Sequence, residues 1–308
     1  MRAMILAAGL GTRLRPLTDV LPKPLAPVVG TPNIVRLIRH LARFGVREIV
    51  INLHHLAGVI PARLGDGSSL GVRIAYSHEP EILGTGGGIR KALHLLGDDT
   101  FLVVNGDAVF APDLTRAVAL HRSSGALATL VVRETPEAEA YGAIGVDKDG
   151  RVRGILSAGD GLAKTMFTGV HVLEPAIGER LPERGCIVRA TYIPLLAEGA
   201  PLAAMVDPGY FCDLGTPRRF LDANLDLVHG RERLEGLEAP ADGVHVGRDV
   251  SFGTGAVLGP GAIVCDGARV APGVRVEQSV VMEGAAVGAD VSFAIVMPDG
   301  SVVHPERV

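Results

Sequence analysis

Short apolar runs alternate with amphipathic stretches along the first half of the chain. Residues 3–8 and 48–53 are mainly apolar; the first run ends at Gly9, and the second is bounded by Gly45 and the pair His54-His55. Both are typical of buried parallel strands. Between them, Thr31 is placed to cap a helix whose first residue is Pro32 and whose apolar residues recur on one face. The order strand, helix, strand predicts a βαβ unit.

The alternation continues to about residue 132. We expect a helix over 89–96, a strand over 101–104, a helix that begins at Asp113 and a strand over 126–132. Alternating elements of this kind predict an α/β fold with a doubly wound sheet. In such folds the ligands bind outside the carboxyl ends of the strands.

A different pattern begins after residue 242, where an apolar residue recurs every six positions. This period predicts a short left-handed parallel β-helix, and the phase of the pattern slips by one residue at Val287. We therefore predict two domains, 1–235 and 243–308, with the tail as a structural element or an oligomerisation face of a homo-oligomer. The apolar series is Val246, Phe252, Leu258, Val264, Val270, Val276 and Met282.

Composition narrows the range of partners. The 308 residues carry a formal net charge of -4 without a cluster of Lys and Arg, so we expect no nucleic acid partner. Cys186, Cys212 and Cys265 are widely spaced, which fits a reducing compartment. No apolar run approaches the ~18 residues of a membrane span, and we expect a cytoplasmic protein that binds no membrane.

A glycine-rich loop follows the first expected strand, over residues 6–18, and Lys23 lies between two prolines soon after it. Glycines let backbone N–H groups approach phosphate oxygens. A dinucleotide site would need a small residue in place of Leu14, and the GK[ST] sequence of a P-loop is absent. What remains is a proline-stiffened phosphate loop with Arg13 and Lys23, which suits a free triphosphate.

This loop and four further segments resemble the sugar-nucleotide pyrophosphorylases, which are sugar-1-phosphate nucleotidyltransferases with a GT-A-like, Rossmann-like fold. The β-helix tail is also similar to the tail of many members. The resemblance implies an enzyme of nucleotide-sugar biosynthesis that joins a nucleoside triphosphate to a sugar 1-phosphate and releases pyrophosphate. The further segments are Gly84-Thr85-Gly86-Gly87-Gly88, Val104-Asn105-Gly106-Asp107, Tyr141-Gly142-Ala143-Ile144-Gly145 and Asp213-Leu214-Gly215-Thr216-Pro217.

The resemblance also implies a magnesium site. Asp107 and Asp213 become carboxylate ligands of Mg²⁺, which prefers hard oxygen ligands, although either residue could instead only cap a turn. Arg13 would hold the pyrophosphate group, and Lys23 would neutralise the α-phosphate or the sugar phosphate. The implied catalytic residues are therefore Arg13, Lys23 and Asp107.

The nucleobase is expected to lie against two backbone segments whose missing side chains open a slot. Thr85 is expected to contact the nucleotide, to cap the following helix, or both. The implied nucleotide-binding residues are Leu6, Ala7, Ala8, Gly9, Gly11, Thr12, Arg13, Gly84, Thr85 and Gly86.

The sugar pocket departs from the pattern of the family. Many relatives carry a Glu-Lys pair shortly after the Tyr-Gly segment, and no such pair occurs between residues 145 and 168. Lys164 is taken as its substitute. The implied sugar-binding residues are Asn105, Gly142, Lys164, Thr168 and Gly169.

The substrates stay open between two pairs. The missing Glu-Lys pair makes residues 1–230 more similar to N-acetylmuramate-1-phosphate uridylyltransferases, which use UTP. The tail is more similar to mannose-1-phosphate guanylyltransferases, which use GTP.

Two other classes of protein are weighed. A non-catalytic sugar-nucleotide sensor is disfavoured because Arg13, Lys23, Asp107 and Asp213 are all present. A β-helix acyltransferase is disfavoured because the tail has room for only about three coils of this period. A metal site at His54 and His55 is not expected, because adjacent residues of an extended segment point to opposite sides.

Overall fold

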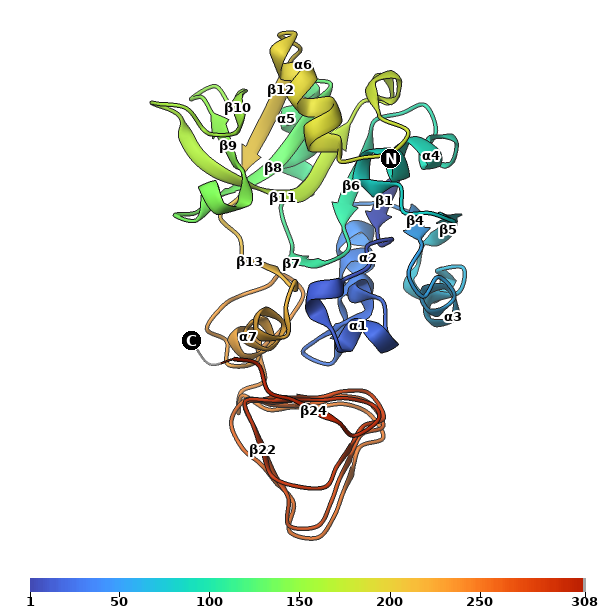
Figure 1. The fold of residues 1–308 in the computed structure, drawn as a ribbon, viewed down its shortest axis with the longest axis vertical. Coiled ribbons are helices and arrows are strands. Elements are labelled where there is room, and N and C mark those ends of the chain that lie inside the picture. The colour runs from blue at the N-terminus through green and yellow to red at the C-terminus, as the bar shows by residue number, and fades with distance from the viewer. Residues whose placement is uncertain (307–308) are drawn as a thin grey trace. The chain divides into compact units, whose positions relative to one another are not determined.

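The structure is a computed structural model that describes residues 1–306, so residues 307 and 308, the last two of the expected tail domain 243–308, lie outside it. The chain forms two compact units (Figure 1). The first contains Met1–Leu10 and Leu37–Gly209, and the second contains Gly11–Arg36 and the chain from Tyr210 onward. The second unit thus combines an early loop with the tail. The division at residues 235 and 243 remains a prediction from sequence pattern.

A nine-stranded sheet forms the centre of the first unit, and its main path has the order β10-β9-β11-β6-β1-β4-β5. Strand β8 pairs with β11, and β12 pairs with β8. The strands are β1 (Ala3–Leu6), β4 (Glu48–Leu53), β5 (Arg73–His78), β6 (Phe101–Asn105), β8 (Ala128–Glu134), β9 (Ala143–Val146), β10 (Val152–Leu156), β11 (Ala163–Leu173) and β12 (Leu202–Val206). A further short strand, β7, covers Ala108–Phe110.

Helices connect these strands largely as the sequence predicts. Asp113 caps α5, because its carboxylate accepts a hydrogen bond from the backbone N–H of Arg116 at 2.9 Å. The prediction that Thr31 caps a helix starting at Pro32 is wrong. Thr31 and Pro32 form a short strand that pairs with Pro27–Val28, and the helix, α2, begins at Asn33. The helices are α2 (Asn33–Arg43), α3 (Val59–Leu64), α4 (Gly84–Leu96), α5 (Leu114–Ser124) and α6 (Ile193–Ala197).

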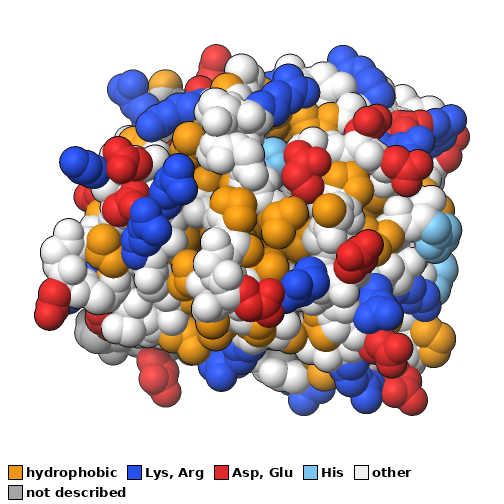
Figure 2. Space-filling view, turned by 90° about the horizontal axis from the view of Figure 1, so that it is seen from above, with side chains coloured by type: hydrophobic (Ala, Val, Ile, Leu, Met, Phe, Trp, Pro, Cys, Tyr) orange, Lys and Arg blue, Asp and Glu red, His pale blue; other side chains and the backbone are white. Residues whose placement is uncertain are grey.

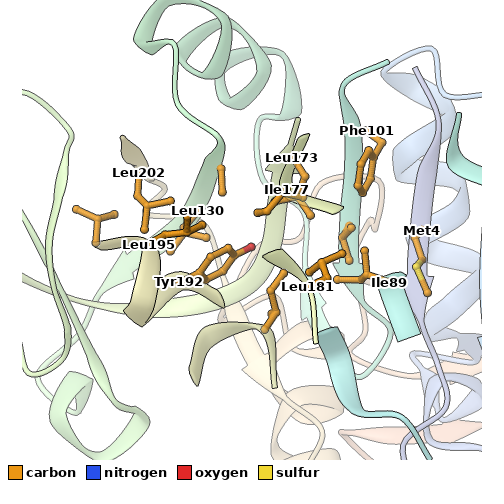
Figure 3. Packing of buried hydrophobic residues seen from close by; sticks show 14 of the residues in the cluster. Met4, Ile89, Phe101, Leu130, Leu173, Ile177, Leu181, Tyr192, Leu195 and Leu202 are labelled. Carbon is orange, nitrogen blue, oxygen red and sulfur yellow. The ribbon is translucent and has the colours of Figure 1, made fainter. Parts of the chain in front are cut away.

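The core of the first unit lies between the sheet and its helices (Figure 3). The first four residues of β6 are all buried, as expected for a strand that is covered on both faces. Phe101 packs in one cluster with Ile89 from α4 and with Tyr192, which is fully buried. Both faces of the sheet are therefore covered at β6.

A short left-handed parallel β-helix lies in the second unit, as the sequence predicts. Each coil contributes one strand to each of three parallel sheets (Figure 1). The sheets consist of β14 (His245–Val246), β17 (Ala262–Val264), β20 (Ser279–Val281) and β23 (Ile295–Val296); of β15 (Ser251–Phe252), β18 (Arg269–Val270) and β21 (Ala286–Val287); and of β16 (Val257–Leu258), β19 (Arg275–Glu277) and β22 (Val291–Ser292). Strand β24 (Val302–Val303) closes the first sheet by antiparallel pairing with β23.

The phase of the six-residue pattern slips earlier than expected. Val264 pairs with Val281 and not with Met282, so the slip precedes Met282 and the expected position at Val287 is wrong. Gln278 has a left-handed φ of 44° at this corner of the coil. We attribute the slip to this tighter corner, which uses one residue fewer.

The remainder of the second unit holds the phosphate loop and the last helix. The short helix α1 covers Leu17–Val20, and β2 (Pro27–Val28) and β3 (Thr31–Pro32) form a hairpin. Strand β13 (Phe211–Asp213) leads to α7 (Pro217–Val228). Thr216 caps α7, because its hydroxyl accepts a hydrogen bond from the backbone N–H of Arg219 at 3.2 Å. No helix within residues 1–306 is both long and apolar enough to cross a membrane.

Candidate active site

The carboxyl ends of three parallel strands meet at one edge of the first unit. Leu6, the last residue of β1, pairs with Asn52 of β4 on one side and with Asn105 of β6 on the other. The chain leaves β1 toward β4 and later returns to β6 on the opposite side of β1, so the strand order reverses between β1 and β6. A reversal of this kind is where open α/β sheets bind ligands.

Asp107 lies at this reversal. It follows Gly106, whose backbone N–H donates to the carbonyl of Leu6 at 2.9 Å, in the turn that leads to β7. Its side chain is half-buried. Among residues 1–306 no group of three His, Cys, Asp or Glu side chains is arranged to hold a metal ion. A cation bound by Asp107 would therefore take most of its ligands from substrate and water, which is usual for Mg²⁺.

The glycine run at the start of α4 packs against another loop of the protein. A Cβ at Gly84 would lie 2.7 Å from the carbonyl oxygen of Gly185, and a Cβ at Gly86 would lie 2.7 Å from the ring of Pro182. The expected open slot is therefore filled at these two glycines by residues 182–185. At Gly9, in contrast, a Cβ would meet nothing within 4 Å, so space is open beside the other expected nucleotide-binding segment, Leu6–Gly9.

Thr85 does not cap α4, because the helix begins one residue earlier, at Gly84, and Leu83 is the cap residue without a side-chain hydrogen bond. The hydroxyl of Thr85 instead accepts a hydrogen bond from the backbone N–H of Ile187 at 2.9 Å. This hydrogen bond therefore connects the start of α4 to the segment around Ile187.

Two residues predicted for the sugar pocket lie together. A Cβ at Gly169 would be 2.4 Å from the amide nitrogen of Asn105, so the Asn105 side chain rests directly on this glycine, whose φ is +83°. Thr168 is different, because its hydroxyl is buried and donates to the carbonyl of Val131 at 2.7 Å. Only the backbone of residue 168 is left to contact a ligand.

Lys164 forms an ion pair that the sequence did not reveal. Its Nζ lies 3.8 Å from Oε1 of Glu139, and both side chains are more than half exposed. Glu139 belongs to the short helix Ala138–Tyr141 that directly precedes Gly142. A Glu-Lys pair is thus present near the Tyr-Gly segment, but its members are far apart in the sequence, so no local motif could identify it.

In the second unit, the phosphate loop is tightly closed on itself. Gly11 has a φ of +63°, and a Cβ there would lie 2.7 Å from the methyl group of Thr18. The Thr18 hydroxyl donates to the carbonyl of Gly11 at 2.9 Å. The residues that follow, Thr12–Leu14, form a short 3-10 helix whose last residue is buried and whose Arg13 side chain is 69% exposed.

Asp213 is the centre of a cluster of cations in the same unit. Its Oδ1 accepts from Nζ of Lys23 at 2.9 Å, and its Oδ2 lies 3.4 Å from Arg219 and 3.7 Å from Arg13. The Lys23 side chain is only 8% exposed. The structure therefore joins three predicted site residues, Arg13, Lys23 and Asp213. It adds Arg219, in the first turn of α7, which the sequence analysis missed although it follows the segment 213–217 closely.

The electrostatics of this cluster suit an anion. Three cationic side chains surround one carboxylate, and the N-terminus of α7 is close in sequence. Surplus positive charge next to backbone N–H groups is a common setting for phosphate. Burial raises the pKa of the neighbouring Cys212 thiol to about 11, so the thiol is protonated near neutral pH.

A cavity of about 360 Å³ lies at the other edge of the first unit. It is lined by the end of α5, the turn before β10 and the residues that precede β12. Figure 2 looks from above onto the edge where β12 begins, and hydrophobic side chains gather there between charged ones. β6 and β8 are both antiparallel to β11, and β12 is parallel to β8, so β12 runs in the same direction as β6. The cavity lies where β12 begins and is therefore remote from the carboxyl ends of the parallel strands.

Comparisons with known proteins cover most of the first 230 residues. The family described as nucleotidyl transferase matches residues 2–230. The N-acetylmuramate alpha-1-phosphate uridylyltransferase of Neisseria meningitidis serogroup B is 40% identical over 229 residues, which are 72% of this chain and 96% of that protein. The mannose-1-phosphate guanylyltransferase of Mycobacterium tuberculosis is 35% identical over 232 residues, which are 74% of this chain.

Some relatives are longer than the match. The alignment covers 65% of the M. tuberculosis protein and 51% of the UTP–glucose-1-phosphate uridylyltransferase of Synechocystis. Among solved structures, HddC from Yersinia pseudotuberculosis complexed with GMP-PN superposes with a TM-score of 0.61 at 27% identity, over 72% of this chain and 97% of HddC. These similarities agree with the fold derived from the strand order.

Proposed function

Because the chain belongs to the nucleotidyl transferase family, we propose that it transfers a nucleoside monophosphate from a nucleoside triphosphate to a sugar 1-phosphate and releases pyrophosphate. The reversal of strand order between β1 and β6 carries this proposal, because it gathers Leu6, Asn105 and Asp107 at one edge of the sheet. The substrates are mannose 1-phosphate with GTP or N-acetylmuramate 1-phosphate with UTP. Relatives with both of these names match the chain at 35% and 40% identity.

The reaction is an in-line displacement that needs no covalent enzyme intermediate. A phosphate oxygen of the sugar 1-phosphate attacks the α-phosphorus, the bond from that phosphorus to the bridging oxygen of pyrophosphate breaks, and pyrophosphate leaves. The attacking oxygen is already anionic, so no strong base is required. The protein contributes mainly position and charge, of which correct orientation alone is worth ~7–11 kcal/mol.

Arg13 and Lys23 supply positive charge in this scheme. Arg13 is exposed and long, so its guanidinium is free to turn from the 3.7 Å contact with Asp213 toward the leaving pyrophosphate. Lys23 is buried and fixed by Asp213, so it offers an ammonium group of constant position. We assign Lys23 to the reacting phosphate and Arg13 to the departing one.

Asp107 and Asp213, which the sequence identifies, are the proposed carboxylate ligands of Mg²⁺. Carboxylate oxygens fit this cation. At Asp213, Oδ2 is the more available oxygen, because its two cationic contacts are longer than the 2.9 Å contact at Oδ1. When bound, Mg²⁺ would neutralise charge on the phosphate oxygens.

Pyrophosphate release tests the function directly. The full chain with MgCl₂ is incubated with each of GTP, UTP, ATP, CTP and dTTP, combined with mannose, glucose or N-acetylmuramate 1-phosphate. We expect release that requires both substrates and is fastest for one of the two proposed pairs. Nucleotide binding without release in any combination would instead support the non-catalytic sensor.

A further inference from the structure

A buried chain of hydrogen bonds connects the end of β1 to the start of α4 within the first unit. The backbone N–H of Ala7 donates to Oδ1 of Asn52 at 2.7 Å. The Nδ2 of Asn52 donates to Oε1 of Glu79 at 2.6 Å, and the backbone N–H of Leu83 donates to Oε2 of Glu79 at 3.0 Å. Asn52 and Glu79 are each 3% exposed.

The direction of every bond in this chain is determined by its two ends. Ala7 and Leu83 both offer backbone N–H donors, so the two side chains between them must supply one acceptor to each. Asn52 accepts from Ala7 with its oxygen and must then donate with its nitrogen. The last side chain must therefore accept twice and donate nothing, which a carboxylate does and an amide does not.

The packing of α4 depends on the same pair. A Cβ at Gly88 would lie 2.7 Å from Oε1 of Glu79 and 2.9 Å from Nδ2 of Asn52. The helix thus rests on the pair only because residue 88 has no side chain. A second contact keeps residue 79 in place, because its carbonyl oxygen is hydrogen-bonded to Nδ1 of His54 at 2.8 Å.

We propose that Asn52 and Glu79 are positioning residues for the nucleotide. Ala7 lies in the segment Leu6–Gly9 and Leu83 directly precedes Gly84, so the pair holds at a fixed spacing the two backbone segments that are expected to receive the nucleoside triphosphate. Both side chains are buried and bonded to these segments, so we expect them to act through the backbone that they hold. This inference rests on the proposed function, because both segments are expected from the sequence to bind the nucleoside triphosphate of that reaction.

The test exchanges the amide and the carboxylate. In Glu79→Gln, the new amide nitrogen faces Nδ2 of Asn52, so two donors face each other. Rotating the Asn52 amide by 180° removes this clash but places its nitrogen against the backbone N–H of Ala7, which is also a donor. In Asn52→Asp, two carboxylates face each other. In the double variant N52D/E79Q, the new aspartate accepts from Ala7 and from the amide nitrogen of the new glutamine, and the amide oxygen of that glutamine accepts from Leu83. Every hydrogen bond is restored, and the negative charge is now on residue 52 in place of residue 79.

Titration calorimetry with GTP and with UTP measures the effect, alongside the melting temperature. Loss of about one hydrogen bond predicts that each single variant raises Kd for the nucleotide about tenfold, and that N52D/E79Q returns it to within about threefold of the original value. The KM for the sugar 1-phosphate is expected to change less than about twofold, because the chain of bonds does not reach the sugar residues.

Glu174→Gln is the matched control. This carboxylate also accepts two hydrogen bonds, from Thr100 at 2.7 Å and from a ring nitrogen of His121 at 2.9 Å, but at the edge where β6 begins. Both bonds end on Oε1, so the amide oxygen of Gln accepts both, and we expect neither the melting temperature nor the nucleotide Kd to change appreciably. This variant therefore controls for the loss of a carboxylate charge elsewhere in the first unit.

The outcomes distinguish the two proposals. If the unmodified protein binds neither GTP nor UTP, the proposed function falls and this inference falls with it. If it binds one of them and folded E79Q and N52D bind it equally well, only the inference is overturned. Weakened single variants that the double variant does not rescue would also overturn it, since the ordered direction of the bonds would then be irrelevant.

Discussion

Lys23 and Asp213 form a partly buried ion pair, with Nζ of Lys23 2.9 Å from Oδ1 of Asp213, and the two residues are far apart in the sequence. The pair joins the proline-flanked phosphate loop to the end of β13, just before α7. The two residues that we propose for the reacting phosphate and for Mg²⁺ are therefore already in contact without a ligand. A substrate phosphate that binds here would share the ammonium group of Lys23 with Asp213, which also contacts Arg13 and Arg219.

Lys23→Met is expected to lower kcat/KM by roughly 100-fold or more, because an ammonium group near the reacting phosphates stabilises charge that shifts at the transition state. Nucleotide Kd should rise less than kcat/KM falls, since Arg13 and Arg219 remain. Steady-state kinetics and calorimetry together separate the two effects.

Arg218→Met is the control for Lys23→Met. Arg218 lies beside Arg219 but pairs with Asp222 at 2.7 Å and stacks on Phe293, and no contact joins it to Asp213 within residues 1–306. Its kcat/KM is expected to stay within about twofold of the original. Proportional losses of binding and turnover in Lys23→Met would show that Lys23 only anchors the ground state.

Asp107→Asn is expected to leave the fold intact and to lower kcat by roughly 100-fold or more, because a neutral amide binds Mg²⁺ poorly and stabilises less phosphate charge. The amount of MgCl₂ needed for half-maximal rate should rise. Asp213→Asn should also lower the melting temperature, because it removes the carboxylate that pairs with the buried ammonium group of Lys23. Full activity of Asp107→Asn at saturating MgCl₂ would rule out this residue as a metal ligand.

His171 gives the fold a defined sensitivity to acid. It is fully buried beside Tyr192, and burial lowers its pKa from 6.5 to about 3. As the pH falls, His171 therefore takes up a proton near pH 6.5 in the unfolded chain but only near pH 3 in the folded chain. The contribution of neutral His171 to the free energy of unfolding is fully present above pH 6.5 and is lost between pH 6.5 and pH 3. Each pH unit in this window costs roughly 1.4 kcal/mol.

Urea unfolding at several pH values checks this prediction. The free energy of unfolding should fall between pH 6 and pH 4 with a slope that is smaller by about one proton in His171→Gln than in the original chain. Equal slopes in the two proteins would show that other groups cause the acid sensitivity.

The sequence predicted the sheet because the apolar runs are long and unambiguous. The runs at 3–8, 48–53 and 101–104 became β1, β4 and β6, and the six-residue period after 242 became the β-helix. What it could not predict was local backbone choice. Thr31 and Pro32 look like a helix start, but pairing with Pro27–Val28 places them in a hairpin, and that contact is invisible to any single-helix pattern.

The candidate site was predictable in its parts and not in its contacts. Residue type and motif order identified Arg13, Lys23 and Asp213, yet nothing in the sequence says that one carboxylate binds several cations, or that Arg219 is among them. The glycines of α4 were interpreted as space for a base, whereas Gly84 and Gly86 are required by the loop 182–185. A glycine signals close approach, but the sequence does not say what approaches.

Deleting residues 241–308 is expected to change the mass of the protein in solution, because a short stack of coils has an open end that favours pairing. It should also lower the melting temperature. A Cβ at Gly261 would lie 2.9 Å from His229 and 3.0 Å from Leu225, so the β-helix packs closely on the end of α7. Light scattering measures the mass, and an unchanged subunit number would refute an oligomerisation role for the tail.

The turn at Gly30 should be the most sensitive point of contact between the early loop and the β-helix. A Cβ at Gly30 would lie 2.0 Å from Nε2 of His245, and the φ of Gly30 is +75°. Gly30→Ala therefore meets two obstacles, a backbone cost of about 1–2 kcal/mol and a collision with the His245 ring. His245→Ala removes the ring and leaves only the backbone cost.

A double-mutant cycle separates these two costs. Urea unfolding of Gly30→Ala, His245→Ala and the double variant should give a double variant that is more stable than the sum of the single losses by about 1–2 kcal/mol. Strict additivity would mean that the ring does not rest on residue 30. Val29, which precedes the turn, donates its backbone N–H to Asn224 of α7 at 2.7 Å, so displacement of the turn should also disturb the loop that carries Lys23. We therefore expect Gly30→Ala to lower kcat/KM, and His245→Ala to restore part of it in the double variant.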